Sequence, residues 1–255
     1  MENRLRYAQP ATCFEQALPL GNGCLGAMVY GDCHRDRISL NHDTLWSGKP
    51  RRTTKPNARD AYQTSRQLLC QDRHAEAEAL LEQDFSAPWS QSYLPLGSLY
   101  MTCSADGEIR DYARQLDLQN AAVTVRYAQG DNRFVRTYFV SHPDNCLVLH
   151  ITSQQPADYV FSADSQLKST VCARENRLYL TGECPVSIAP EYARDSVPTV
   201  YDGTGIRFAA IGTVKTDGSI RCDGDTLSVT GATELTALLC IETSVAGFDA
   251  APAKP

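Results

Sequence analysis

Polar side chains gather in the segment LNHDTLWSG at 40–48, directly after an apolar, strand-like run. An indole presents a flat apolar face on which a pyranose ring can stack, and polar neighbours can hydrogen-bond to sugar hydroxyls. The segment therefore predicts a loop that faces a carbohydrate. The candidate substrate-binding residues are Asn41, His42, Asp43, Thr44 and Trp46.

A purely structural role is the alternative for each of these residues. Asn and Asp side chains accept backbone N–H bonds and build turns themselves, which applies to Asn41, Asp43 and Thr44. Trp46 is equally compatible with a lid over the core. The sequence leaves both interpretations open.

Metal chemistry is the next possibility, because two cysteines and two histidines lie within 24–42. None of the pairs has the two-to-four residue spacing of a structural zinc site. Cys33 and His34 are adjacent and would point to opposite faces of a strand. We therefore expect neither a metal site nor a cofactor.

Two further kinds of chemistry find little support. Gly21, Gly23 and Gly26 lack the Gly-Lys-Ser/Thr ending of a phosphate loop and precede no helical pattern. Glycoside hydrolysis needs a pair of facing carboxyl groups, whereas the acids here lie mostly in turns or on helices. We therefore predict no catalytic residue within this chain.

The elements that must position the loop are mainly β-strands. Val123, Val125 and Tyr127 share one face at a spacing of two, and QGDN at 129–132 predicts a hairpin to the run 133–140. Many short strands separated by turns are typical of a sandwich or barrel. Further strand-like runs cover 146–152, 158–163, 177–182, 205–214, 226–230 and 234–243.

One segment breaks the strand pattern. Residues from about 57 to 85 are rich in Ala, Leu, Gln, Glu and Arg and contain neither Gly nor Pro. Their spacing predicts two short helices with Asp72 as the N-cap of the second. The sequence thus predicts a helical insertion in a β domain.

Composition limits the function classes. The 255 residues are 42% hydrophobic, which suffices for a sizeable core, and carry a net charge of −6. This mildly acidic balance argues against nucleic acid and membranes as partners. The N-terminus lacks the apolar stretch of a signal peptide, and several cysteines lie inside strand-like runs, so we expect a cytoplasmic protein.

Seven segments in a fixed order carry a family resemblance. They are ALPLGNGCLGAMVYG, ISLNHDTLWSGKP, ARDAYQTSRQLL, YLPLGSLYM, DYARQLDLQNA, FVRTYFVS and ETSVAGFD. Together they resemble the N-terminal domain of glycoside hydrolase family 95, whose members are mainly α-L-fucosidases.

The resemblance implies a β-supersandwich of antiparallel sheets, a linker and a catalytic (α/α)6 barrel. On this basis 1–248 is the sandwich domain, 249–255 begins the linker, and the barrel with its catalytic residues is absent. The barrel, on the same or a neighbouring polypeptide, and a fucosylated oligosaccharide are the implied partners. This chain departs from the family where it has His42 for the usual Glu and Cys24 for a common Arg.

Three hypotheses follow. The first is a non-catalytic module that packs on a fucosidase barrel and supplies one edge of the sugar pocket. The second is a free-standing carbohydrate-binding module with Trp46 as its aromatic platform. The third is a truncated relic whose barrel-facing surface is a bare apolar patch.

Overall fold

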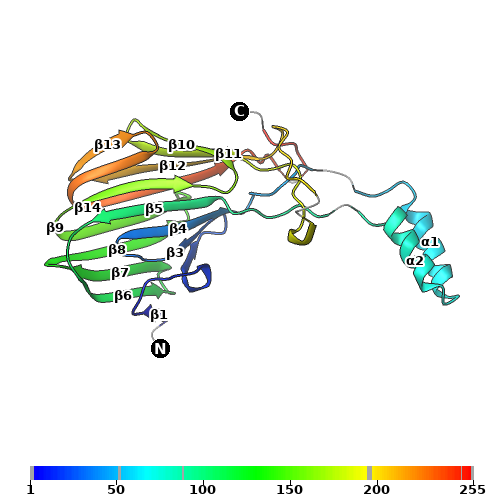
Figure 1. The fold of residues 1–255 in the computed structure, drawn as a ribbon, viewed down its shortest axis with the longest axis horizontal. Helices are drawn as coiled ribbons and strands as arrows, with labels where there is room; N and C mark the ends of the chain where they lie inside the picture. Colours follow the sequence, from blue (N-terminus) through cyan, green and yellow to red (C-terminus); the bar gives the residue numbers. More distant parts are fainter. Residues whose placement is uncertain (1–2, 51–52, 88, 194–196, 248, 254–255) are drawn as a thin grey trace.

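The computed structural model describes residues 3–50, 53–87, 89–193, 197–247 and 249–253. Within these ranges, fourteen antiparallel strands form one connected hydrogen-bonded network, which confirms the predicted mainly β supersandwich (Figure 1). The strands are β1 (Arg4–Tyr7), β2 (Leu18–Gly21), β3 (Leu25–Val29), β4 (Arg35–His42), β5 (Gly97–Ser104), β6 (Ile109–Asp117), β7 (Ala122–Gln129), β8 (Asn132–Ser141), β9 (Cys146–Asp164), β10 (Lys168–Arg174), β11 (Arg177–Glu183), β12 (Arg207–Thr216), β13 (Ser219–Asp223) and β14 (Thr226–Thr243). Two short 3-10 helices, η1 (Phe14–Gln16) and η2 (Glu191–Ala193), lie in connecting segments.

Two long strands join the layers of the sandwich. One layer has the strand order β1-β6-β7-β8-β9-β14-β12-β11-β10. The other layer has the order β2-β3-β4-β5, and its strand β5 pairs with β9. The first half of β9 pairs with β8, and its second half pairs with β5. β14 changes direction at register shifts between Val229 and Glu234, where extra residues bend a strand.

These long strands differ from the sequence prediction. The predicted pairs of separate strands at 146–152 and 158–163, and at 226–230 and 234–243, are continuous as β9 and β14. The polar residues between them mark a change of pairing partner and not a loop. The predicted hairpin is confirmed, since β7 and β8 pair around the turn at 130–131.

The core lies between the two layers and follows the alternation of side chains along each strand. Leu99 and Phe161 come from one layer and meet Leu178 and Val214 of the other around a small apolar void. The alternation reflects the strand period of two, which sends successive side chains to opposite faces.

A polar group is also buried between the layers. The Asp36 carboxylate on β4 and the Arg136 guanidinium on β8 are fully buried and lie 4.0 Å apart. Tyr138 donates its hydroxyl to Asp36 at 2.5 Å, and the Gly31 N–H donates to the other carboxylate oxygen at 2.7 Å. This ion pair ties the β2–β5 layer to the layer that contains β8.

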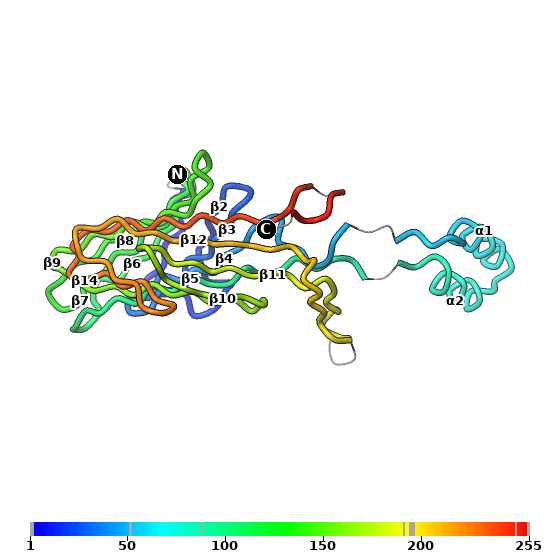
Figure 2. The backbone as a smooth tube through the Cα atoms, turned by 90° about the horizontal axis from the view of Figure 1, so that it is seen from above, coloured from blue at the N-terminus to red at the C-terminus, as the bar shows by residue number. Residues whose placement is uncertain are grey.

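The predicted helical insertion is confirmed as α1 (Ala58–Leu69) and α2 (His74–Asp84). Both views show the two helices together, projecting from one end of the sandwich (Figures 1 and 2). Small residues form the buried side of the pair, namely Ala58, Ala61, Ser65 and Ala77.

The predicted N-cap is wrong. Asp72 adopts a left-handed conformation with φ of 60°, which places it in the turn between the helices. Arg73 occupies the N-cap position, and its side chain binds Glu76 through two hydrogen bonds of 2.7 and 2.5 Å. No helix in the described part of the chain is long and apolar enough to cross a membrane.

Candidate functional site

The candidate site lies at one end of the sandwich, where β3 begins and where β4 and β14 end. β3 and β4 are antiparallel neighbours, with Leu25 opposite His42. The Asp43 N–H donates to the Cys24 carbonyl at 2.9 Å and extends this pairing by one step. The hairpin therefore brings together two residues, Cys24 and His42, that are 18 positions apart in the sequence.

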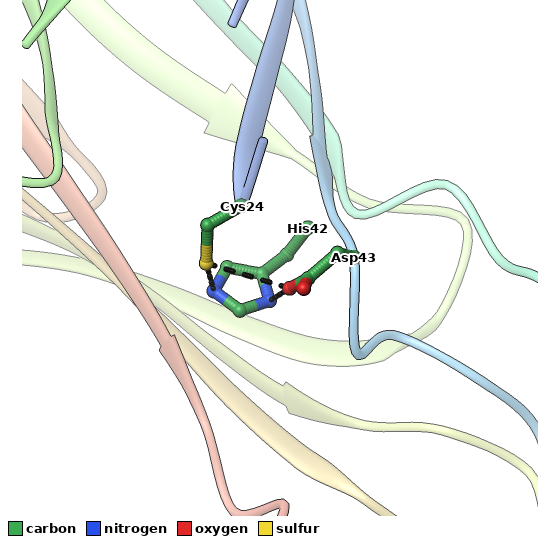
Figure 3. A group of neighbouring side chains, drawn as sticks. All are labelled: Cys24, His42 and Asp43. Atoms are coloured by element: carbon green, nitrogen blue, oxygen red, sulfur yellow. Dashed lines mark hydrogen bonds and ion pairs between the residues drawn. The ribbon is translucent and has the colours of Figure 1, made fainter. Parts of the chain in front are cut away.

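Three potential ligand side chains converge at this point (Figure 3). The Cys24 Sγ lies 3.2 Å from His42 Nε2 and donates to Asp43 Oδ1 at 3.4 Å. The same Asp43 oxygen is 3.1 Å from His42 Nδ1. His42 is buried, Cys24 is half-buried and Asp43 is exposed, so the cluster opens to solvent on the Asp43 side.

Two threonines hold His42 in place. Its Nδ1 lies 2.9 Å from Thr44 Oγ1, and that hydroxyl is 2.6 Å from Thr243 Oγ1 at the end of β14. The chain of three side chains connects the loop after β4 to the other layer of the sandwich. The imidazole orientation is therefore set by tertiary contacts.

An asparagine pair fixes Cys24 from the other side. The Asn22 side-chain oxygen Oδ1 accepts the backbone N–H groups of Cys24 and Leu25 at 3.0 and 2.8 Å. Its amide donates to the Asn145 side chain at 2.8 Å. These contacts leave the Cys24 side chain facing His42.

The electrostatics do not favour Cys24 as a nucleophile. Burial raises the pKa of its thiol, and the neighbouring Asp43 carboxylate raises that pKa further. The reactive form of a cysteine is the thiolate, which a raised pKa disfavours. Cys24 with His42 is therefore a poor candidate for covalent catalysis.

A pocket of about 610 Å³ lies beside this cluster. Trp46 forms part of its wall and is 41% exposed, so it is not a lid over the core. The indole N–H donates to the Asp43 carbonyl at 2.9 Å, and the ring packs on Tyr93 with centroids 4.9 Å apart. Other parts of the wall come from Thr44, Lys49, Gln91, Ile206, Val245 and Pro252.

The five predicted substrate-binding residues divide into two groups. Asp43, Thr44 and Trp46 line the pocket. The Asn41 side-chain oxygen accepts the backbone N–H of His42 at 2.9 Å within β4, and the buried His42 is not among the described residues that line the pocket.

A second groove of about 810 Å³ has Thr243 in its lining. It contains two carboxylates, Glu183 and Glu242, but Glu183 is paired with Lys168 at 2.7 Å.

The sequence did not predict that Glu242 lies close enough to Cys24 to raise the pKa of the Cys24 thiol. The two residues belong to different layers of the sandwich. The one signal that could have joined Cys24 to His42 is the register of the β3–β4 hairpin.

Comparisons with known proteins fit this architecture. The family described as "Glycosyl hydrolase family 65, N-terminal domain" matches residues 5–247. Alpha-L-fucosidase 2 of Arabidopsis thaliana is 29% identical over 82% of this chain and 26% of its own length. "Probable alpha-fucosidase A" of Aspergillus niger is 31% identical over 66% of this chain and 22% of its own length.

A solved structure supports the fold alone. A human-microbiome protein assigned as a kojibiose phosphorylase superposes with a TM-score of 0.51 at 8% identity, covering 95% of this chain and 32% of that protein. The chain spans about a quarter of the length of the fucosidase relatives that it matches. The resemblance to the N-terminal domain of a fucosidase-type glycoside hydrolase is thus confirmed, and the chain belongs to the family of N-terminal domains described for glycosyl hydrolase family 65.

Proposed function

We propose that this chain is a non-catalytic module that packs on an (α/α)6 barrel, and that the combined enzyme hydrolyses terminal α-L-fucosides. The loop at 42–50 supplies one edge of the sugar pocket. Two relatives named as fucosidases support the substrate, and the short share of their length supports a catalytic part elsewhere. The family match ends at 247, in line with a sandwich domain of 1–248 followed by a linker.

The observation that carries this proposal is the composition of the pocket around Trp46. An exposed indole lies beside Lys49, Gln91 and Thr44, a combination suited to stacking on a sugar ring and bonding its hydroxyls. Among the described lining residues, Asp43 is the one carboxylate. Inverting hydrolysis needs two carboxyl groups, roughly 6.5–9.5 Å apart. The pocket can therefore hold a sugar and lacks the pair that would cleave it.

The direct test measures fucose release from fucosylated lactose. Purified 1–255 should release none, whereas a polypeptide in which 1–255 precedes a fucosidase barrel should release it. In that longer polypeptide, Trp46→Ala should lower kcat/KM by about 2- to 10-fold, because stacking on an aromatic ring contributes about 0.5–1.5 kcal/mol. Turnover by 1–255 alone would refute the proposal.

A carbohydrate-binding module that acts alone is the second candidate, and the exposed face of Trp46 favours it. Calorimetric titration of 1–255 with fucose and fucosyllactose separates the two functions. Binding at millimolar concentration or tighter that disappears in Trp46→Ala would support independent binding. Absence of binding until a barrel is present would support the first proposal.

A further inference from the structure

We propose that Cys24, His42 and Asp43 form a site for a transition-metal ion of the zinc class. This inference rests on the residues at the end of the β3–β4 hairpin and is independent of the proposed fucosidase role. It revises the expectation from sequence spacing, which considered pairs close in the chain and not pairs opposite each other across two strands.

The donor set points to zinc. A thiolate sulfur, an imidazole nitrogen and a carboxylate oxygen are the three ligand types that Zn²⁺ accepts in proteins. Calcium and magnesium prefer oxygen ligands alone, which excludes them as good matches. One ligand atom from each residue lies within 4.8 Å of the other two.

The distances suit a single ion between the side chains. Zinc–sulfur and zinc–nitrogen bonds of about 2.3 and 2.0 Å at a tetrahedral angle place the two ligand atoms about 3.5 Å apart. The observed separations are 3.2 Å from Cys24 Sγ to His42 Nε2 and 3.4 Å from Cys24 Sγ to Asp43 Oδ1. The Asp43 side chain is exposed, and its Oδ1 lies 3.1 Å from His42 Nδ1.

The surroundings of His42 support the same role. A ligating histidine usually donates its other ring N–H to an acceptor, which fixes its tautomer. Here Thr44 Oγ1 lies 2.9 Å from Nδ1 and can accept that proton in the tautomer with the hydrogen on Nδ1, and the same hydroxyl lies 2.6 Å from Thr243 Oγ1. In that tautomer Nε2 carries the lone pair, and this nitrogen is the one that lies 3.2 Å from Cys24 Sγ.

The site leaves a fourth position for water, as in sites with three protein ligands. Binding releases the Cys24 thiol proton to solvent, and no electrons are exchanged. Because Asp43 accepts the Trp46 indole N–H through its backbone carbonyl, an ion on Asp43 also restrains the loop that carries Trp46. The metal would therefore order one wall of the pocket.

Cobalt is the probe of choice, because Co²⁺ replaces Zn²⁺ and absorbs light when bound to thiolate. Reduced 1–255 is titrated with Co²⁺, and the expected result is one equivalent bound with sulfur-to-cobalt charge-transfer absorption and tetrahedral visible bands. Competition with Zn²⁺ should bleach both signals. Cys24→Ser should abolish the charge-transfer band, and Asp43→Asn should weaken binding by about 10- to 100-fold.

A matched control uses Cys222→Ser, because Cys222 is also half-buried but lies on β13, outside the site. This variant should retain the full cobalt spectrum. Circular dichroism verifies that each variant is folded, and Asp43→Asn serves as the test if Cys24→Ser does not fold, because Asp43 is exposed. No charge-transfer band in the parent protein, or a band that persists in Cys24→Ser, would overturn the proposal.

Discussion

Two polar clusters in this molecule have similar ingredients and opposite settings. Asp36 and Arg136 lie fully buried between the layers, and both oxygens of the carboxylate accept hydrogen bonds from the protein. Cys24, His42 and Asp43 lie at the end of the sandwich, where Asp43 is exposed and a pocket begins. The first cluster is enclosed between the layers, whereas the second has an exposed carboxylate at the edge of a pocket.

The two clusters differ in how the free-energy cost of removing their charged groups from water is compensated. A buried charge is tolerated only when neighbouring groups compensate it, so removing one partner is far more costly than removing a group at the rim. A carboxylate at the rim, such as that of Asp43, is exposed to water, which keeps it available for binding. A fully buried ion pair therefore identifies structural residues here, and an exposed carboxylate beside a pocket marks the functional candidate.

The strongest test of this contrast is Asp36→Ala. Loss of the carboxylate leaves Arg136 as an uncompensated buried charge, so the free energy of unfolding should fall by about 3–5 kcal/mol. Urea denaturation measures the change. Asp43→Ala, the control at the rim, should shift the same quantity by about 0.5 kcal/mol or less without metal. Equal losses in the two variants would contradict the contrast.

Metal linkage tests the rim cluster. Zinc at a free concentration 100-fold above its dissociation constant should raise the free energy of unfolding by about 2.7 kcal/mol, because it binds the folded state. Thermal unfolding with zinc, and again after a chelator, measures the gain and its reversal. Cys24→Ser should show no gain, and an unchanged gain in that variant would place the ion elsewhere.

A double-mutant cycle sharpens the assignment of the buried pair. Asp36→Leu and Arg136→Met should each destabilise strongly, while the double variant should be more stable than the sum of the two changes predicts. We expect a coupling of about 2 kcal/mol, because the second substitution removes the charge that the first leaves unpaired. Additive losses measured by urea denaturation would mean that the two groups do not act as a pair.

The smallest effect concerns the support of His42. Thr44→Val keeps the side-chain shape but loses the contacts to His42 and Thr243. The free energy of unfolding should therefore fall by about 1 kcal/mol. Thr181→Val, at an exposed strand position, should change stability by a few tenths of a kcal/mol. An equal change in the free energy of unfolding of both variants would mean that the Thr44 hydroxyl does not stabilise His42.

Much of the fold was predictable because it depends on local patterns. The alternation of Val123, Val125 and Tyr127 identifies the strand and its buried face, and the turn at 130–131 identifies the partner strand. The helical composition of 57–85 likewise predicts α1 and α2 to within a residue or two. The prediction of Asp72 as an N-cap was wrong, because the choice among turn conformations depends on neighbouring contacts such as that of Arg73 with Glu76.

The site was predictable in part. The segment at 41–46 identifies a polar loop with an exposed indole, since residue types alone suggest that function. The sequence by itself determined the mainly β class, the helical insertion and the family. Tertiary structure alone decided that Cys24 faces His42 and that Thr243 supports Thr44, because pairing across strands and layers joins residues 18 and 199 positions apart. The first pair depends on the register of one hairpin, and the second, between two layers, leaves no local signal in the sequence.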